Sequence, residues 1–324
     1  MTAALVSIHN LHLHFNTYAG KAYALNGVEL EIAQNDFMGL VGETGCGKSI
    51  TSFAILNLIP AGGEISAGEV FFQGENLLKK SEKQMQAIRG KQIAMVSQDP
   101  SAYLNPLFTV GQQLSMVIKQ HQAYTKAERF EKACELLATV ELPNPERIMK
   151  SYPHELSGGM KQRVAIALAL SCSPDLLIAD EPTTDLDVTI QAQILDLLQR
   201  LRQTNNITIL MVTHDLAVVA ETCQRVTVLY AGRTVETGNV EEVIYDPKHP
   251  YTQALLLASP NPDGRGEKLN RIPGRLPSTY SPLPGCAFHP RCPHAMQICK
   301  TAPPPLQPLG KDRRVACYLH SNQD

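Results

Sequence analysis

A short glycine-rich segment between a strand and a helix places the strongest constraint on the fold. Residues Gly42–Ser49 read G-E-T-G-C-G-K-S and fit the pattern G-x4-G-K-[ST]. The apolar run Phe37–Val41 before them indicates a buried strand, and a helical pattern follows from Lys48 to about Leu58. In this setting successive backbone amides cradle phosphate oxygens, supported by the positive end of the helix dipole. The sequence therefore predicts an α/β fold with a phosphate cradle.

Side chains in the cradle have separate expected roles. Lys48 can reach the β- and γ-phosphates of ATP, and the Ser49 hydroxyl can bind Mg²⁺. Cys46 has two interpretations, a small residue that fills space or a thiol made reactive by Lys48 and the helix N-terminus. All eight residues of this segment and the next one are expected to contact ATP: Gly42, Glu43, Thr44, Gly45, Cys46, Gly47, Lys48, Ser49 and Ile50.

Strand and helix patterns alternate along most of the chain, which predicts a parallel sheet covered on both faces. Residues Ala4–Phe15 alternate apolar and polar side chains and predict strands at a sheet edge. Further strands are expected at Val28–Ile32, Glu69–Phe72, Ile93–Ser97, Leu176–Ala179, Ile207–Val212 and Arg225–Tyr230. Helices are expected after Gly159 and at Val188–Arg202 and Asp215–Glu221.

The period becomes helical from Thr109 to Val140, which predicts a helical insert at about 100–158. Thr125 and Glu128 have the spacing of a capping box. Four apolar residues then fall on one helix face: Phe130, Ala133, Leu137 and Val140.

Composition excludes several classes of protein. Of the 324 residues, 44% are apolar and 19% are charged, which is typical of a globular chain and not of a disordered one. The formal net charge of −2 argues against nucleic-acid binding. We expect no secretory signal, and no apolar window reaches the roughly 20 residues that span a bilayer. Any membrane pore is therefore expected in other chains.

Polar residues follow three of the predicted strands. Asp180 and Glu181 come directly after Leu176–Ala179; Asp180 is expected to hold Mg²⁺ and Glu181 to act as a general base or to position water. His214 ends another strand, where it can contact the γ-phosphate or serve only a structural purpose. Gln98 ends a third strand at the start of the helical insert and can bind Mg²⁺ or water.

A second glycine-rich helix start suggests the family. The segment Leu156–Gln162, L-S-G-G-M-K-Q, resembles the signature sequence of ABC ATPases, with Met160 in a position where glutamine is commoner. Together with the cradle, Gln98, Asp180-Glu181 and His214, it makes about residues 5–245 resemble an ABC ATPase subunit. The resemblance implies an α/β P-loop NTPase domain of the ABC type, with a parallel core sheet, an antiparallel β edge subdomain and a helical insert.

The resemblance also implies a head-to-tail dimer that binds and hydrolyses ATP with Mg²⁺. Ser157, Gly158 and Gly159 of one subunit would cap the ATP held by the other. Tyr18 stands where the family places an aromatic ring that stacks on adenine, with Tyr23 as the alternative. One departure is Asp185 in the D-loop, where alanine or glycine is commoner, and we expect it to tune dimer closure.

The last part of the chain changes character at Asp246. Prolines become dense, and we expect an irregular C-terminal lobe at 246–324 beside an ATPase domain at 1–245. Three motifs make the lobe similar to that of the oligopeptide/dipeptide permease ATPases: His249–Thr252, Ile272–Gly274 and Gly285–Pro293. Members of that group move peptides, nickel chelates, glutathione, opines or sugars, so the solute stays open.

Four of the eight cysteines lie in this lobe with the spacing C-x5-C-x6-C-x17-C: Cys286, Cys292, Cys299 and Cys317. The resemblance implies a [4Fe–4S] cluster on these four thiolates, as other members of the permease group hold. Tetrahedral zinc, with His289 or His294 as substitute ligands, is the alternative, and free thiols are the third possibility.

The resemblance implies partners as well. We expect a second ABC ATPase subunit, a paralogue in a heterodimer, together with two transmembrane permease subunits and an extracytoplasmic solute-binding protein. The assembly would place this chain at the cytoplasmic face of the inner (plasma) membrane. A non-transport ABC ATPase is the distant alternative, but the long coiled-coil insert or second cassette of such proteins is absent from the sequence.

Overall fold

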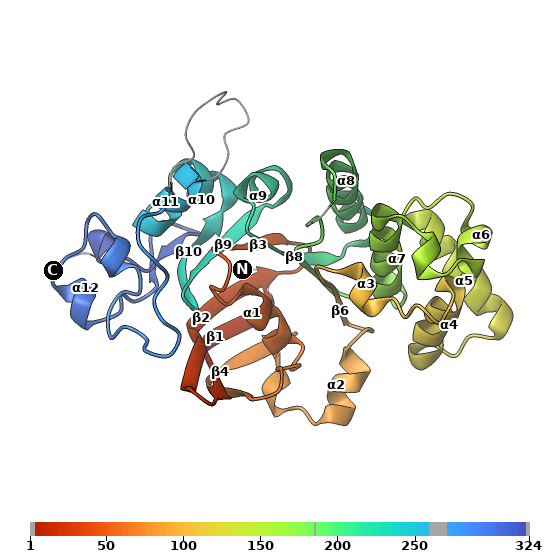
Figure 1. The fold of residues 1–324 in the computed structure, drawn as a ribbon, viewed down its shortest axis with the longest axis horizontal. Coiled ribbons are helices and arrows are strands. Elements are labelled where there is room, and N and C mark those ends of the chain that lie inside the picture. The colour runs from red at the N-terminus through yellow and green to blue at the C-terminus, as the bar shows by residue number, and fades with distance from the viewer. Residues whose placement is uncertain (1–3, 185, 259–270, 322–324) are drawn as a thin grey trace. The chain divides into compact units, whose positions relative to one another are not determined.

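The computed structural model describes residues 4–184, 186–258 and 271–321 (Figure 1). The chain forms two compact units, one from Met1–Lys79 with Val212–Asp324 and the other from Lys80–Met211. In the described ranges, no helix has the length and apolar character needed to cross a membrane.

The first unit contains an antiparallel sheet with the order β2-β1-β4-β5. Strand β1 (Ala4–Thr17) pairs with β2 (Gly20–Ala33) on one side and with β4 (Gly63–Phe72) on the other, and β5 (Glu75–Asn76) follows β4. The expectation that the first strand lies at a sheet edge is therefore wrong. Its apolar–polar alternation reports one buried face, and an interior strand of an antiparallel sheet has that pattern too.

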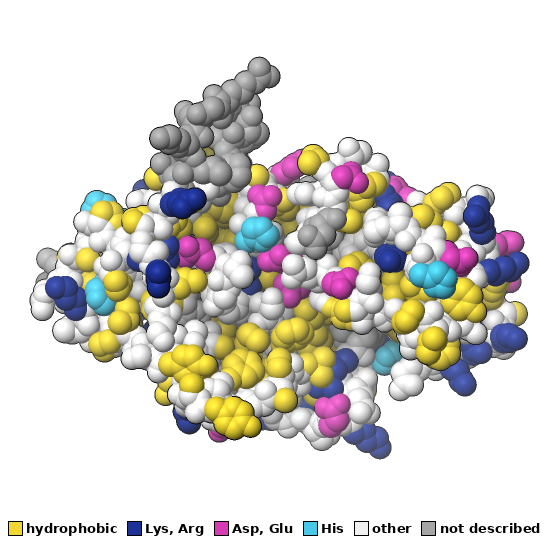
Figure 2. Space-filling model, viewed as in Figure 1, with side chains coloured by type: hydrophobic (Ala, Val, Ile, Leu, Met, Phe, Trp, Pro, Cys, Tyr) yellow, Lys and Arg dark blue, Asp and Glu magenta, His cyan; other side chains and the backbone are white. Residues whose placement is uncertain are grey.

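One face of this unit carries exposed apolar side chains. Figure 2 shows hydrophobic side chains gathered over β1, β2, β4 and the helix α1 (Lys48–Ile55). Tyr18, in the turn between β1 and β2, is wholly exposed, and Leu58 is 47% exposed. The Tyr18 ring is thus available to a ligand from solvent.

The strands of the second, eight-stranded sheet that belong to the first unit have the order β11-β12-β10-β9-β3. The fully buried β3 (Phe37–Val41) runs parallel to β9 (Arg225–Tyr230), and β9 is antiparallel to β10 (Arg233–Asn239). Two short strands of the C-terminal lobe extend this sheet, namely β12 (Arg314–Val315), which pairs with β10, and β11 (Gln307–Pro308). The lobe is thus less irregular than expected, because the edge of β10 supplies partners for its backbone.

Short helices complete the first unit. They are α9 (Leu216–Thr222), α10 (Val240–Tyr245), α11 (Pro250–Ala258), α12 (Ile298–Thr301) and the 3₁₀ turns η1 (Leu77–Lys79), η3 (His289–Arg291) and η4 (Tyr318–His320).

The second unit contains the parallel strands β6 (Ile93–Val96) and β7 (Leu176–Asp180), next to which lies β8 (Thr208–Thr213). Its helices are α2 (Glu82–Ile88), α3 (Pro100–Tyr103), α4 (Val110–His121), α5 (Lys126–Thr139), α6 (Pro145–Lys150), α7 (Gly158–Leu170) and α8 (Val188–Asn205), with a 3₁₀ turn η2 at Pro153–Glu155.

The helical insert has the expected character: α4, α5 and α6 pack together (Figure 1). The capping box at Thr125 is present, because the Glu128 amide donates to Thr125 Oγ1 at 3.3 Å and Glu128 Oε2 accepts from the Thr125 amide at 2.7 Å. Ala133, Leu137 and Val140 are buried, whereas Phe130 is 42% exposed and lies at the border of the apolar face.

Candidate nucleotide site

The glycine-rich loop folds into an open turn between β3 and α1. Gly45 has a φ of +83°, and a Cβ added there would meet no other atom within 4 Å, so the backbone angle and not crowding requires glycine. The Cys46 amide donates to the Glu43 carbonyl at 3.1 Å, which closes the turn. Lys48 is 6% exposed, and its Nζ donates to the Gly42 carbonyl at 2.8 Å and the Glu43 carbonyl at 3.3 Å. The ammonium group therefore lies against the loop it is expected to serve.

Cys46 is wholly buried inside this loop. Burial raises the pKa of its thiol, and the nearby Lys48 ammonium opposes that shift only in part. Because a thiol must ionise to react, this environment favours the interpretation of Cys46 as a residue that fills space.

The two candidate adenine-stacking tyrosines lie on the same hairpin. Tyr18 is at its tip, and Tyr23 lies in β2, where its amide donates to the Thr279 carbonyl of the C-terminal lobe at 2.8 Å. Tyr23 also lines a cavity together with Gly45 of the cradle and lobe residues Leu276–Thr279. The assignment of adenine to Tyr18 stays a prediction, and Tyr23 shares a cavity with the cradle loop.

His214 is exposed directly after β8. The turn that carries it is ordered, because the Asp215 amide donates to Thr213 Oγ1 at 3.0 Å and Asp215 Oδ1 accepts from the Ala217 amide at 2.9 Å. Asp215 thereby caps α9, and the backbone on both sides of His214 is held in place.

The predicted acidic pair lies at the end of β7. Asp180 is 5% exposed as the last residue of the strand. Glu181 follows with a φ of +48°, a left-handed conformation that residues other than glycine rarely adopt. Thr184 Oγ1 donates to Glu181 Oε2 at 3.0 Å and fixes the carboxylate. Strained backbone at a carboxylate of this kind is typical of functional sites.

Gln98 is exposed in the turn between β6 and α3. The next residue, Asp99, caps α3 by accepting from the Ser101 amide at 2.8 Å. Burial, together with the carboxylates of Asp180 and Asp99, raises the pKa of Tyr103 in α3. The turn after β6 and the end of β7 are therefore neighbours within the second unit.

The signature segment begins α7. Ser157 is the N-cap residue, and its Oγ accepts from the Met160 amide at 3.3 Å. A Cβ on Gly159 would lie 2.7 Å from Ile190 Cγ2, so packing against α8 requires glycine there. Among the described residues, a Cβ on Gly158 would meet only Leu186 Cδ2 at 3.7 Å, an ordinary contact. Gly158 is exposed, and none of the described residues around it excludes a side chain. Asp185, the unusual residue of the D-loop, lies outside the described residues.

The predicted site residues thus form one group in each unit. The first unit holds the cradle, both tyrosines and His214, and the second holds Gln98, the signature segment, Asp180 and Glu181. Two contacts with the cradle are not predicted by the sequence: the Tyr251 hydroxyl accepts from the Glu43 amide at 2.9 Å, and Arg291 pairs with the Glu43 carboxylate. Both partners are in the C-terminal lobe, more than 200 residues away, and no local pattern connects them to the cradle.

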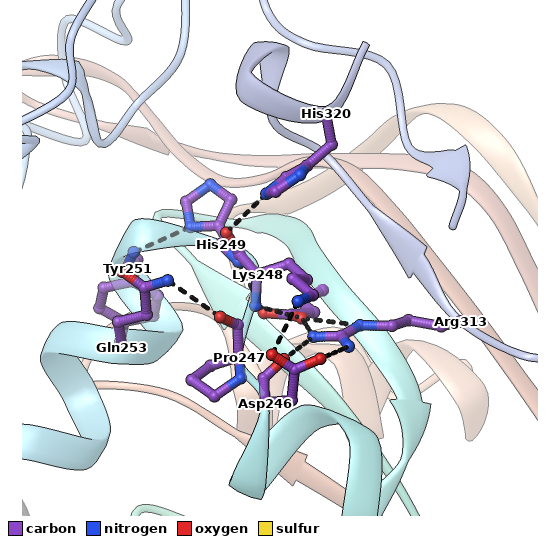
Figure 3. A network of polar contacts seen from close by, with 9 residues as sticks. Asp246, Pro247, Lys248, His249, Tyr251, Gln253, Arg313 and His320 are labelled. Carbon is purple, nitrogen blue, oxygen red and sulfur yellow. Dashed lines mark hydrogen bonds and ion pairs between the residues drawn. The ribbon is translucent and has the colours of Figure 1, made fainter. Parts of the chain in front are cut away.

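The C-terminal lobe is attached to β10 by a buried polar network (Figure 3). Glu236 is wholly buried; its Oε1 accepts from Arg313 Nε at 3.1 Å and from the Lys248 amide at 3.0 Å, and its Oε2 accepts from the His249 amide at 3.0 Å. Burial, with a contribution from His320, lowers the pKa of His249 to about 3. His249 Nδ1 accepts from the Tyr251 amide at 3.0 Å, so the neutral ring suits its position.

The four lobe cysteines line one small cavity, with His249, His289 and His294 also on its wall. The Cys286 amide donates to the Cys299 carbonyl at 2.8 Å, which brings the first and third cysteines to adjacent backbone. Burial raises the pKa of Cys286 and raises that of Cys317 to about 11. Within the described residues, however, no three or more His, Cys, Asp or Glu are arranged to hold a metal ion, so this geometry does not support the predicted zinc or cluster.

Comparisons with known proteins agree with these motifs. A family model described as "ABC transporter" matches residues 25–184, and one described as "Oligopeptide/dipeptide transporter, C-terminal region" matches residues 235–299. The chain is 47% identical to the oligopeptide transport ATP-binding protein OppD of Escherichia coli, over 97% of this chain and 93% of that protein. It is 42% identical to the dipeptide transport ATP-binding protein DppD of Bacillus subtilis, over 98% and 96%.

Solved structures agree with the fold. A dimeric ATP-binding cassette in a post-hydrolysis state, bound to ADP and Pi, matches with a TM-score of 0.65 at 30% identity, over 72% of this chain and 98% of that chain. The cbiO1 protein of Clostridium perfringens, part of the cbiONQ ABC transporter complex, also has a TM-score of 0.65, at 28% identity over 75% and 91%. The predicted fold class is confirmed. The chain belongs to the ABC transporter family, among the ATP-binding proteins that carry the oligopeptide/dipeptide transporter C-terminal region.

Proposed function

We propose that this chain is the ATP-binding and ATP-hydrolysing subunit of an ABC importer that takes up dipeptides, oligopeptides or a related small solute. The observation that carries the proposal is the 47% identity to an oligopeptide transport ATP-binding protein over nearly the whole of both chains. Relatives named for dipeptide transport match over a similar share of their length. Both groups of names support a peptide cargo over nickel chelates, glutathione, opines or sugars.

The cradle supplies the phosphate-binding half of the proposed site. Backbone amides of Gly42–Ser49 and the Lys48 ammonium would bind the β- and γ-phosphates, and Tyr18 would stack on adenine. Glu181, held by Thr184, would accept a proton from the attacking water, while His214 would contact the γ-phosphate.

Oxygen donors suited to Mg²⁺ are available for the cation that accompanies ATP. Ser49, Gln98 and the nearly buried Asp180 offer a hydroxyl, an amide and a carboxylate oxygen, which are the ligands that this hard cation prefers. When bound, Mg²⁺ offsets negative charge on the phosphates. Asp180 would hold it through water.

The signature segment supports a head-to-tail dimer. Gly158 has room for a side chain but none is present, as expected if the helix start of α7 must admit a phosphate group of ATP held by another subunit. We propose that Ser157, Gly158 and Gly159 cap the ATP in the cradle of a paralogous ATPase. Two transmembrane subunits and a solute-binding protein complete the importer, with this chain at the cytoplasmic face of the inner membrane.

We further propose that Cys286, Cys292, Cys299 and Cys317 hold a [4Fe–4S] cluster. What supports it is the shared cavity that all four line. In such a cluster each thiolate binds a different iron, so the sulfurs lie further apart than around one zinc ion. We propose the cluster, and not a single zinc ion, for this cavity. Iron and sulfide analysis of anaerobically purified protein, compared with Cys292→Ser, tests this; zinc or no metal in the wild type would overturn it.

The catalytic assignment is tested with Glu181→Gln. This variant keeps the shape of the side chain but cannot accept a proton, so we expect it to bind ATP, to hydrolyse it at least 100-fold more slowly and to accumulate as a closed dimer. ATP binding is measured with a fluorescent analogue, turnover by phosphate release and the dimer by size-exclusion chromatography. Turnover at the wild-type rate would remove Glu181 from the role of base.

A further inference from the structure

Arg291 of the C-terminal lobe binds the side chain of Glu43, the second residue of the phosphate cradle. It lies in η3, between Cys286 and Cys292, and its side chain is 4% exposed. Arg291 Nη1 donates to Glu43 Oε2 at 2.8 Å and Nη2 donates to Glu43 Oε1 at 3.0 Å. The two parallel bonds form a fork, which fixes the orientation of the carboxylate as well as its position.

The remaining donors of Arg291 are also used within the protein. Its Nε donates to the Pro273 carbonyl at 2.9 Å, Nη2 to the Ile272 carbonyl at 3.3 Å and Nη1 to the Tyr230 hydroxyl at 3.2 Å. The guanidinium carbon also lies 5.8 Å from the centre of the Tyr230 ring. Every nitrogen of the group therefore has a partner, and a lysine could not reproduce this planar set of bonds.

Glu43 is held by the lobe at its backbone too. Its amide donates to the Tyr251 hydroxyl at 2.9 Å, and Tyr251 is wholly buried in α11. The main chain and side chain of one cradle residue thus both depend on residues beyond 245. The neighbouring carbonyl of Glu43 accepts from Lys48 Nζ, so a shift of Glu43 would move the lysine that serves the phosphates.

The negative charge on Glu43 makes its pairing with Arg291 important for the binding of an anionic ligand. A carboxylate at the second position of a cradle for triphosphate would repel the ligand if it were unpaired, and a half-buried site screens that repulsion poorly. The Glu43 side chain is 25% exposed, so water solvates its carboxylate only in part. The guanidinium of Arg291 supplies the compensating charge.

We propose that Arg291 is a positioning residue for ATP, through which the C-terminal lobe forms part of the nucleotide site. It holds Glu43 in place and neutralises its charge, so that the cradle accepts a triphosphate. The inference rests on the proposed ATP-binding function. Because coupling is reciprocal, ATP bound in the cradle must also stabilise the lobe around Arg291.

A simpler role for the pair would be to attach the lobe to the body of the protein. Arg314 provides a matched control, because it belongs to the same lobe and pairs with Glu31 of β2 at 3.4 Å, on a strand that precedes the cradle. If attachment alone mattered, loss of either arginine would affect ATP in a similar way.

The experiment compares Arg291→Gln, Arg291→Lys, Glu43→Gln with Arg291→Gln, and Arg314→Gln in the full chain. The dissociation constant of a fluorescent ATP analogue with Mg²⁺ is measured after thermal melting confirms that each variant is folded. We expect Arg291→Gln to weaken binding at least tenfold, Arg291→Lys to weaken it less, the double variant to recover most of the loss, and Arg314→Gln to bind like the wild type. Should Arg291→Gln fail to fold, the Lys and double variants still test the charge and the fork.

Three results would overturn the inference: wild-type affinity in Arg291→Gln, an equal loss in Arg314→Gln, or a double variant no better than Arg291→Gln. Hydrogen exchange gives a second readout that attachment alone does not predict. ATP should slow exchange at amides 286–292 in the wild type but not in Arg291→Gln. Lys48→Ala distinguishes a failure of the proposed function from a failure of the role of Arg291. A wild type that binds the ATP analogue no better than Lys48→Ala refutes the proposed function. Normal binding by Arg291→Gln refutes only the role of Arg291.

Discussion

The buried carboxylate of Glu236 in β10 pairs with the guanidinium of Arg313, which lies 77 residues later in the chain. The same carboxylate accepts the amides of Lys248 and His249 (Figure 3). One fully buried acid therefore organises the start of the C-terminal lobe and its last strand. The arrangement makes the lobe and β10 depend on each other for stability.

Arg313→Ala should be strongly destabilising. The substitution leaves Glu236 buried without its cation, and breaking a buried pair in this way costs about 3–5 kcal/mol. Arg314→Ala removes a pair whose side chains are 28% and 43% exposed, and should cost no more than about 1 kcal/mol. Urea denaturation of both variants measures the difference, and equal losses would contradict the importance of the buried network.

His249 should make the protein less stable in acid. Its pKa of about 3 in the folded protein lies below the ordinary value of 6.5, so the unfolded chain binds the proton first. The stability contributed by the neutral ring is complete above about pH 6.5 and is lost as the pH falls toward 3. At pH 5 the loss is about 2 kcal/mol relative to neutral pH.

His249→Asn provides the comparison for this pH effect. The asparagine carbonyl oxygen can accept the Tyr251 amide as Nδ1 does, but the side chain does not titrate in this range. We therefore expect the variant to lose less stability than the wild type between pH 7.5 and pH 5, measured by urea denaturation. Parallel losses in the two proteins would show that other groups control the acid response.

Local patterns predicted the elements whose burial does not depend on distant partners. Phe37–Val41 and Arg225–Tyr230 have the predicted bounds, because each is a largely buried, mostly apolar segment between turn residues. The neighbouring β10 was not predicted, since it buries the polar residues Thr234, Glu236 and Thr237. A polar side chain in a strand predicts a solvent-exposed position unless its buried partner is known, and for Glu236 that partner is Arg313.

The candidate site shows the same division. The cradle, the signature segment and the acids at the end of β7 are contiguous motifs, so the sequence displays them directly. Glu43 and Arg291 are 248 residues apart, and neither stands out in its own segment. Contacts across such a separation are set by the packing of the lobe on the body, which periodicity and spacing do not encode.

Cys46 should resist alkylation in the native protein. Its side chain is wholly buried, so the reagent reaches it poorly. Burial also raises the pKa of the thiol, so little of it is ionised to the reactive thiolate. Iodoacetamide at pH 7.5 followed by peptide mass spectrometry, with and without urea, measures the effect. Rapid labelling in the native state that ATP prevents would instead support a reactive thiol in the cradle.

Adjacent glycines of the signature segment should respond in opposite ways to alanine. Gly159→Ala places a Cβ 2.7 Å from Ile190 Cγ2, and overpacking of this kind costs about 1–3 kcal/mol, measurable as a lower Tm. Gly158→Ala makes only an ordinary contact with Leu186 and should leave Tm unchanged or slightly raised, because alanine favours helix over glycine.

ATPase activity should also distinguish the signature segment from the cradle in the proposed dimer site. If the start of α7 must admit a phosphate of ATP held by another subunit, the added methyl in Gly158→Ala obstructs it while the fold stays intact. The variant should therefore bind ATP in its own cradle normally but lose most ATPase activity in the assembled dimer. Lys48→Ala is the matched control, because it should lose ATP binding in its own cradle while its signature segment stays unchanged. Full activity in Gly158→Ala would mean that this glycine faces no ligand.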